Sequence, residues 1–201
     1  MKKKLVLAFL MATLFAGGAF AQFSLSAGGG ALLVPSFSRT KAGSVSDTIS
    51  NFDFGVNGFF DATYAELNVG LLFGKMDMGS VKLNTMTLTF GLLGKFPFSV
   101  SDNLVIFPFA GIDYNVGLSA KSGDVKLPNM GDFMNALSVV FGGGVDFSIT
   151  ESLYIRGEVG FGITFNTRAQ KTAKDVAALT NTDYSTFNGK IPIKIAVGYR
   201  F

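Results

Sequence analysis

The sequence predicts an all-β fold, namely an eight-stranded antiparallel up-and-down transmembrane β-barrel that is left after a signal peptide is cleaved. Three observations predict it. Large apolar residues recur at every second position, as in GKIPIKIAVGYRF at residues 189–201. The composition is 48% hydrophobic and only 15% charged, with 25 Gly and 22 Phe. Long polar links alternate with short ones along the chain. Alternation with a period of two is typical of a strand whose two faces meet different surroundings.

Residues 1–21 are expected to be a secretory signal peptide. Three lysines at positions 2–4 precede an apolar run that ends in the small-residue cleavage site AFA at 19–21. Residues 22–201 then form one domain, the barrel. Loss of the three lysines reduces the 17 Lys and Arg to 14, which equals the 14 Asp and Glu, so the mature chain is formally neutral. Its basic residues form no cluster, and no nucleic-acid partner is expected.

Eight strands are expected, and each has one face without Asp, Glu, Lys or Arg. In the last strand, the cations Lys190, Lys194 and Arg200 share the opposite face. Lipid offers no hydrogen-bond partners, so a sheet can cross it only as a closed barrel. A Lys or Arg facing lipid near mid-membrane would cost about 2 to 4 kcal/mol. The apolar faces are therefore expected to meet hydrocarbon and the charged faces the lumen. The expected strands cover residues 23–33, 52–60, 65–73, 86–96, 104–118, 137–147, 153–165 and 191–201.

The connections predict the orientation. Short periplasmic turns and longer extracellular loops are typical of outer-membrane barrels. Both termini are therefore expected in the periplasm and the long loops outside the cell. Long polar loops are expected at 35–51, 119–135 and 166–188, an intermediate one at 75–82, and short links near 62, at 97–103 and at 150–152.

Two local departures from this pattern are expected. Residues 170–179 have apolar residues at helical spacing, which predicts one or two helical turns within the last long loop. Pro108 removes a backbone donor from an interior strand, which predicts a β-bulge at that position. Glycine runs at 28–30 and 142–144 connect no strand to a helix, as phosphate-binding loops do, and are expected to relieve crowding within the sheet.

Charged residues on the inward faces are expected to form a network inside the barrel. Asp146 and Arg156 lie five residues on either side of Glu151, so a tight turn places them opposite each other as an ion pair. An eight-stranded barrel leaves an interior that side chains fill. We therefore expect these groups to satisfy one another and close the lumen rather than line an ion path. Three more charged residues at comparable heights are expected to join the network: Glu66, Glu158 and Lys194.

No pattern of catalytic or metal-binding residues is present. The chain has no His, Cys or Trp, which excludes a His-based catalytic triad and zinc sites built on His or Cys. No candidate nucleophile and base occur together. Neither enzymatic activity nor a cofactor is expected.

Two segments resemble known outer-membrane proteins. The ending Tyr199-Arg200-Phe201, with apolar residues at alternate positions before it, resembles the C-terminal signal by which the assembly machinery recognises outer-membrane barrels. The segment PFAGIDYNVG at 108–117 resembles a strand of the small eight-stranded barrels of the OmpX, OmpW and OmpA-transmembrane type. The resemblance implies an integral protein surrounded by outer-membrane lipid and inserted by the barrel-assembly machinery, with Tyr199 and Phe201 as the assembly signal.

Three functions remain open. The first is a closed barrel with a side-chain-filled lumen, which presents its long loops to an extracellular ligand or host molecule. The second is a small OmpW-like transporter of apolar molecules, for which Leu72, Leu93 and Val140 on the polar faces give slight support. The third is a soluble periplasmic carrier resembling a lipocalin, with its large residues inward. The Gly-rich polar faces and the terminal Phe argue against the third.

Overall fold

The computed structural model describes residues 24–43, 45–78, 81–123, 125–127, 130–165, 167–179 and 183–201. The expected signal peptide, residues 1–21, lies outside the described residues.

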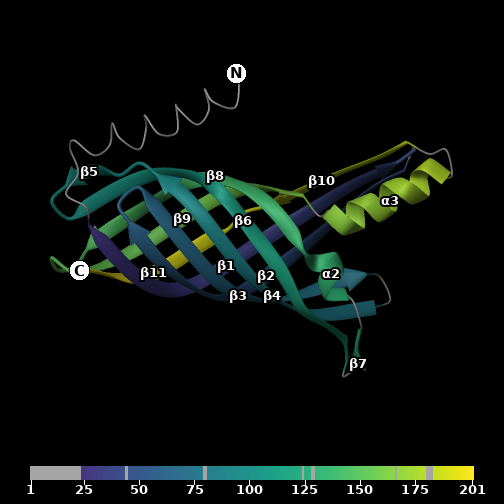
Figure 1. Ribbon diagram of the computed structural model, residues 1–201, viewed down its shortest axis with the longest axis horizontal. Coiled ribbons are helices and arrows are strands. Elements are labelled where there is room, and N and C mark those ends of the chain that lie inside the picture. Colours follow the sequence, from purple (N-terminus) through teal and green to yellow (C-terminus); the bar gives the residue numbers. More distant parts are fainter. Residues whose placement is uncertain are drawn as a thin grey trace, which may run out of the picture.

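The described chain is an antiparallel sheet that closes on itself (Figure 1). Each long strand pairs with its neighbour in sequence, and β1 pairs with β2 on one side and with β10 and β11 on the other. β10 and β11 are two segments of one wall strand, interrupted at Ile191 and Pro192, so the ring contains the eight strands that the sequence predicts. The long strands are β1 (Leu25–Ala42), β2 (Val45–Ala62), β3 (Ala65–Met78), β4 (Val81–Lys95), β6 (Leu104–Ser122), β8 (Ala136–Ser148), β9 (Leu153–Phe165), β10 (Tyr184–Lys190) and β11 (Ile193–Arg200). The short strands β5 (Phe98–Ser101) and β7 (Val125–Lys126) pair with β6.

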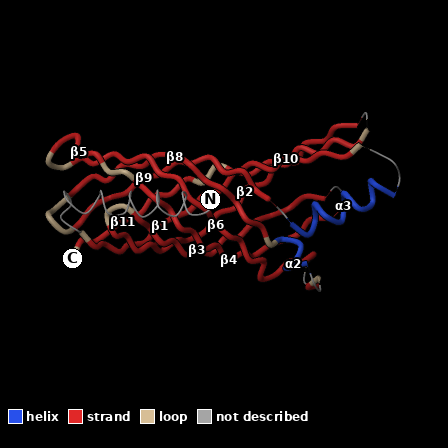
Figure 2. Tube along the Cα trace, turned by 45° about the horizontal axis from the view of Figure 1, so that its top comes forward, coloured by secondary structure: helices blue, strands red, loops and turns tan. Residues whose placement is uncertain are grey.

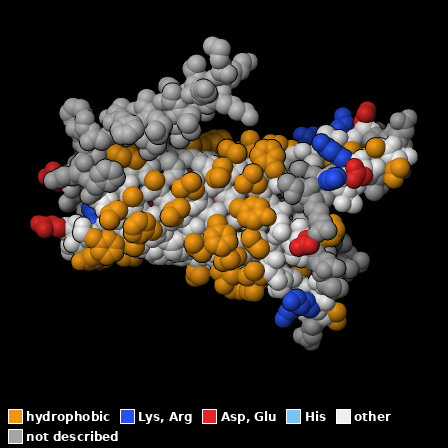
Figure 3. All heavy atoms as spheres, in the orientation of Figure 1, with side chains coloured by type: hydrophobic (Ala, Val, Ile, Leu, Met, Phe, Trp, Pro, Cys, Tyr) orange, Lys and Arg blue, Asp and Glu red, His pale blue; other side chains and the backbone are white. Residues whose placement is uncertain are grey.

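The two faces of the wall are inverted relative to a soluble protein. Along β11, Ile195 is 61% exposed and Lys194 is 4% exposed; along β9, Val159 is 54% exposed and Arg156 is 1% exposed. Figure 3 shows hydrophobic side chains over the middle of the barrel and charged ones gathered at its ends. The prediction that the apolar faces point outward is confirmed. These faces are the reverse of those in a lipocalin-like carrier, and they make the sheet a transmembrane β-barrel.

Several segments expected to be loops are extensions of the wall. β1 and β2 remain paired as far as Ala42 and Val45, with a turn at Gly43, where φ is 60° and glycine is favoured. The prediction of a loop at 35–51 is therefore wrong, as is that at 75–82. Residues 35–51 are mostly polar on both faces, and at 75–82 the positions that continue the apolar alternation of β3 are Lys75 and Asp77, so neither stretch has the apolar outward face that marks a strand in lipid. Their backbone ladder nevertheless continues beyond the apolar belt.

The other two long links contain helices. Residues 119–135 include the end of β6, the strand β7 and the helix α2 (Met130–Met134), and residues 166–188 include α3 (Thr167–Leu179) and most of β10. α3 is longer than the one or two turns expected. None of the described helices is long and apolar enough to cross a membrane. Figures 1 and 2 show α3, β10 and the β1–β2 hairpin projecting at the end of the barrel opposite the C-terminus.

The bulge predicted at Pro108 is absent, since β6 pairs with β8 without a shift from Leu104 to Asn115. The carbonyl oxygen of Pro108 accepts a hydrogen bond from Phe96 N, just after β4 ends at Lys95. Pro108 has no N–H to donate, and the side of β6 on which that N–H would lie faces the gap between β4 and β5. The ladder is already interrupted there, so no strand hydrogen bond is lost. The register shift on β6 lies instead near Leu118, between Gly117 and Ser119.

Candidate functional site in the barrel lumen

The lumen runs from a short-turn end to a hairpin end. The short-turn end contains the turns at 63–64, 102–103 and 149–152, together with the C-terminus, and the hairpin end contains α2, α3 and the β1–β2 turn. From the short-turn end, the interior consists of a polar cavity of about 500 Å³, a charged and aromatic layer, a small apolar pocket and a second cavity with a mixed polar and apolar lining.

Arg156 is the centre of the charged layer. Its Nε and Nη2 donate to the two carboxylate oxygens of Asp146, at 2.7 and 2.6 Å, across the β8–β9 ladder where the two residues are direct partners. Nη2 also donates to Asp61 at 2.7 Å, and Nη1 donates to Glu66. A planar guanidinium has five N–H donors, and this arrangement ties β9 to three other strands, β8, β2 and β3.

Two lysines complete the layer. Lys194 Nζ lies 2.5 Å from Glu66 Oε1 and 2.7 Å from Glu158 Oε2, and Lys95 pairs with Asp61 and, at 3.4 Å, with Glu66. We call this set the lumen charge network, and it has three cations and four carboxylates. Its members are Asp61, Glu66, Lys95, Asp146, Arg156, Glu158 and Lys194.

All five residues assigned from the sequence lie in this network, and two members were missed. Asp61 and Glu66 are direct cross-strand partners around the turn at Thr63 and Tyr64. The hairpin rule that paired Asp146 with Arg156 would have found them, but two carboxylates do not suggest an ion pair. Lys95 and Arg156 supply the positive charge that makes the Asp61–Glu66 arrangement tolerable.

Three aromatic rings inside the barrel pack around the central cation of the network, Arg156. The guanidinium of Arg156 lies 4.6 Å from the ring centroid of Phe59, 5.1 Å from that of Phe107 and 5.2 Å from that of Tyr154. Cation–π contacts of this kind are strongest where water is excluded. We call these three rings and the lumen charge network together the lumen plug.

The glycine runs explain how such large rings fit in a narrow barrel. A Cβ on inward-facing Gly28 would collide with the ring of Phe59, and one on Gly144 would collide with that of Phe107. A Cβ on Gly198 would likewise collide with the ring of Tyr154. The rings therefore occupy the space that side chains at these glycines would take, as expected for glycines that relieve crowding.

Apolar side chains form the layer above the plug, toward the hairpin end. Leu93 and Val140 cluster with Phe107 and Phe109, while Leu72 clusters with Leu32 and Val34. The pocket that they help to line has a volume of about 70 Å³.

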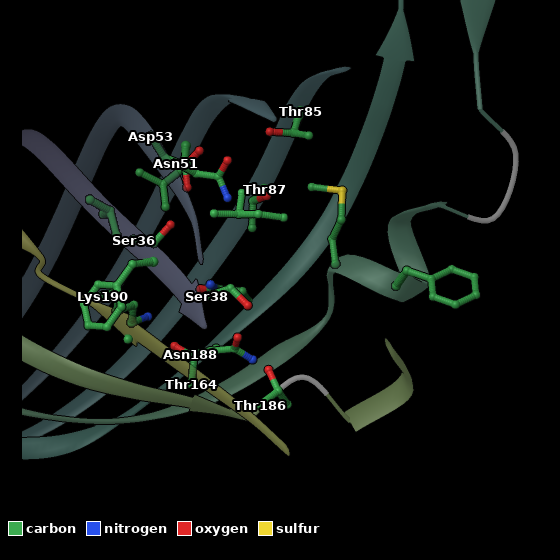
Figure 4. Close-up of a pocket in the computed structure, with 18 of the residues that line it drawn as sticks. Ser36, Ser38, Asn51, Asp53, Thr85, Thr87, Thr164, Thr186, Asn188 and Lys190 are labelled. Atoms are coloured by element: carbon green, nitrogen blue, oxygen red, sulfur yellow. The ribbon is translucent and has the colours of Figure 1, made fainter. Parts of the chain in front are cut away.

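The cavity at the hairpin end has a volume of about 360 Å³, and its lining combines serine, threonine and asparagine side chains with apolar and aromatic ones such as Val34, Phe37 and Leu72 (Figure 4). Near its floor, Lys190 Nζ lies 2.5 Å from Asp113 Oδ1. We call it the hairpin-end cavity. The labelled side chains in Figure 4 surround it: Ser36, Ser38, Asn51, Asp53, Thr85, Thr87, Thr164, Thr186, Asn188 and Lys190.

The two residues assigned as the assembly signal lie at the short-turn end. Tyr199 and Phe201 are exposed, and their ring centroids are 5.5 Å apart in an edge-on arrangement. Phe201 N donates to Leu25 O at 2.9 Å, so backbone pairing between the first and last strands continues to the last residue. No group of three or more His, Cys, Asp or Glu that could hold a metal ion occurs within the described ranges.

No protein-family model matches the sequence, and no curated protein matches it. Among solved structures, Neisserial surface protein A (NspA) is 11% identical and matches 85% of this chain and 97% of its own, with a TM-score of 0.47. The outer membrane protein OprG from Pseudomonas aeruginosa is 11% identical over 89% of this chain and 96% of its own, with a TM-score of 0.45. The attachment invasion locus protein Ail of Yersinia pestis is 11% identical over 87% of this chain and 99% of its own, with a TM-score of 0.38. The closed ring and its inverted faces themselves define this chain as a small eight-stranded transmembrane β-barrel.

Proposed function

We propose that the protein is an integral outer-membrane barrel with a closed lumen, which presents its long hairpins and the hairpin-end cavity at the cell surface. The observation that carries this proposal is the lumen plug. Its central residue Arg156 is 1% exposed, and Glu66 and Tyr154 are fully buried. Cavities on the two sides of the plug are separate, as expected for a barrel whose interior is filled by side chains.

The hairpin end has features of an interaction surface. Leu179 at the end of α3 is 88% exposed and Val125 in β7 is 66% exposed, both beyond the apolar belt. In the proposed orientation both termini lie in the periplasm, and this end meets extracellular ligands or host molecules.

Assembly in this proposal proceeds through β11. Tyr199 and Phe201 occupy the lipid-facing side at the periplasmic end, where the barrel-assembly machinery would bind the C-terminal strand. Aromatic residues at this level also suit the interfacial girdles of outer-membrane barrels. The surrounding partner is outer-membrane lipid, which covers the exposed belt.

The second candidate function is the transport of apolar molecules, and the apolar layer of Leu72, Leu93 and Val140 favours it. The pocket beside this layer has a volume of about 70 Å³. Typical small-molecule sites are roughly 300 to 1,000 Å³. The small pocket therefore gives the transporter less support than the plug gives to the closed barrel.

Planar-bilayer recordings test the closed lumen. Refolded protein, shown to be folded by heat-modifiable gel migration, is expected to produce no conductance steps, with or without a detergent-like apolar ligand. A porin incorporated in the same bilayers is the positive control. Reproducible steps would contradict the closed barrel, and a response to the apolar ligand would favour the transporter.

Cysteine labelling of intact cells tests the orientation, because the natural chain has no Cys. Val125→Cys lies at the hairpin end and Ser99→Cys in β5 at the short-turn end, and both positions are exposed. A membrane-impermeant maleimide is expected to label Val125→Cys on intact cells and to label Ser99→Cys only after lysis. The opposite pattern would reverse the orientation.

A further inference from the structure

We propose that the hairpin-end cavity is a saccharide-binding site, whose central polar contact is Asp53. This inference rests on the proposed function in one respect, namely that this end of the barrel faces the outside of the cell. The ligand class follows from the hydrogen-bonding groups of the cavity.

The cavity contains hydrogen-bond acceptors that lack donors. The amide oxygens of Asn51 and Asn115 are buried and have no hydrogen-bond partner among the described residues. Asp53, on the same face of β2 as Asn51, has neither a hydrogen bond nor an ion pair within the described part of the chain, although its side chain is half-buried. A buried polar group without a hydrogen-bond partner destabilises the fold. A ligand with several donors would remove this destabilisation.

The rest of the lining can both donate and accept. Hydroxyl groups of Ser36, Thr87, Thr164 and Thr186 come from four different strands and surround the space (Figure 4). A hydroxyl has one donor and two acceptor positions. Such a ring of hydroxyls and amides suits a ligand that carries hydroxyl groups around its whole rim. The cavity volume of about 360 Å³ is within the range of small-molecule sites.

Charge and apolar contacts narrow the ligand class. The charged residues of the lining are Asp53, Lys75 and Lys190. Lys190 is paired with Asp113, and the charges of Asp53 and Lys75 balance each other, so the cavity has no net charge to attract an anion or a cation. An organic cation could pair with Asp53 but would leave the amide oxygens on β2 and β6 unsatisfied. Val34 and Leu72 give the cavity an apolar surface against which the C–H face of a sugar ring can pack. A neutral saccharide fits all three properties.

One wall of the cavity is held in place by a close backbone contact. α2, whose Met134 lines the cavity, packs on Gly117 of β6, where a Cβ would lie 2.5 Å from the carbonyl oxygen of Gly131. Asn135 Oδ1 accepts a hydrogen bond from Gly117 N at 2.9 Å. The wall is therefore formed before a ligand binds, which reduces the entropy cost of binding.

Titration of the refolded full barrel tests the proposal, in a detergent without a sugar headgroup. The probes are D-glucose, D-galactose, N-acetylglucosamine and maltotriose, followed by calorimetry or saturation-transfer NMR. At least one is expected to bind, and Asp53→Asn is expected to weaken its binding about tenfold or more, because a charge-assisted hydrogen bond is lost. The matched control is Asp47→Asn, on the same strand but exposed and outside the cavity, and it is expected to bind as the natural chain does.

The probes also distinguish a free sugar from the end of a glycan chain as the ligand. Tighter binding of glucose than of maltotriose identifies a free sugar as the ligand, and the reverse order identifies the end of a glycan chain. If Asp53→Asn does not fold, Asn51→Ala is used instead. It removes from the same cavity an acceptor that has no donor in the protein, and it is also expected to weaken saccharide binding.

The inference is overturned if no saccharide binds the folded natural chain, or if Asp53→Asn and Asp47→Asn bind equally well. It is also overturned if ethanolamine binds in an Asp53-dependent manner and the saccharides do not. A barrel that conducts ions yet binds a saccharide through Asp53 contradicts only the proposed closed lumen. A closed, correctly oriented barrel that binds no saccharide contradicts only this inference.

Discussion

Arg156 and Asp146 face each other across the β8–β9 ladder and are joined by two parallel hydrogen bonds, from Nε at 2.7 Å and from Nη2 at 2.6 Å. Such a fork-to-fork contact fixes the orientation of the guanidinium. Its remaining donors then reach Asp61 and Glu66 on the far side of the lumen. One cross-strand pair thus positions the group that closes the interior.

Replacing Arg156 by Gln is expected to weaken the fold without preventing insertion. The substitution leaves Asp61, Glu66 and Asp146 without their shared cation, and breaking a buried ion pair costs about 3 to 5 kcal/mol. Urea unfolding in lipid vesicles measures the free energy of unfolding.

The matched control is Arg200→Gln. Arg200 lies nearer the short-turn end, where Nη1 donates to Ser148 and the guanidinium lies 4.6 Å from the ring centroid of Tyr154. Since no carboxylate depends on it in the described contacts, a loss of about 1 kcal/mol is expected. Equal losses for the two variants would argue against a central role for Arg156.

Replacing Ile195 by Lys is expected to block assembly. Ile195 is on the lipid-facing side of β11, and a Lys there costs about 2 to 4 kcal/mol near mid-membrane. Heat-modifiable gel migration of the outer-membrane fraction measures the folded barrel. Val125→Lys, at an exposed position beyond the belt, is the control and is expected to assemble normally. Normal assembly of both variants would mean that Ile195 does not meet hydrocarbon.

Neighbouring glycines in one run are expected to differ in their tolerance of a side chain. A Cβ at Gly142 would lie 2.6 Å from the Cα of Gly160 and 2.7 Å from the ring of Phe109, whereas at outward-facing Gly143 the nearest atom is 3.7 Å away. Gly142→Val should therefore cost about 1 to 3 kcal/mol in unfolding free energy. Gly143→Val should be neutral or stabilising, because it adds an apolar group to the lipid face. A result in the opposite order would place Gly143 on the crowded face.

The barrel could be predicted from the sequence because lipid imposes a strict rule on alternate residues. Where one face of a strand meets hydrocarbon, the pattern is visible, and the eight strands and their faces follow from it. Beyond the belt the rule does not apply. The extensions of β1 and β2, and most of β10, are polar on both faces and were therefore expected to be loops.

The interior could be predicted in part, for a similar reason. Hairpin symmetry predicts which residues oppose each other across one turn, as for Asp146 and Arg156. It says nothing about contacts across the lumen, such as those of Lys194 with Glu66 or of Lys190 with Asp113. The effect of Pro108 could not be predicted from its own strand either. β6 accommodates this proline without a bulge because the neighbouring strand β4 ends beside it.

The central claim is that the bulky apolar face of each strand touches lipid while the charged face is enclosed. Single tryptophans test it most directly, since the natural chain has none. Phe141 points outward and Phe109 inward at almost the same height, because Phe141 pairs with Ala110, the neighbour of Phe109. In vesicles of lipids with brominated acyl chains, we expect strong fluorescence quenching of Phe141→Trp and little quenching of Phe109→Trp. Equal quenching of the two, or stronger quenching of Phe109→Trp, would contradict the account.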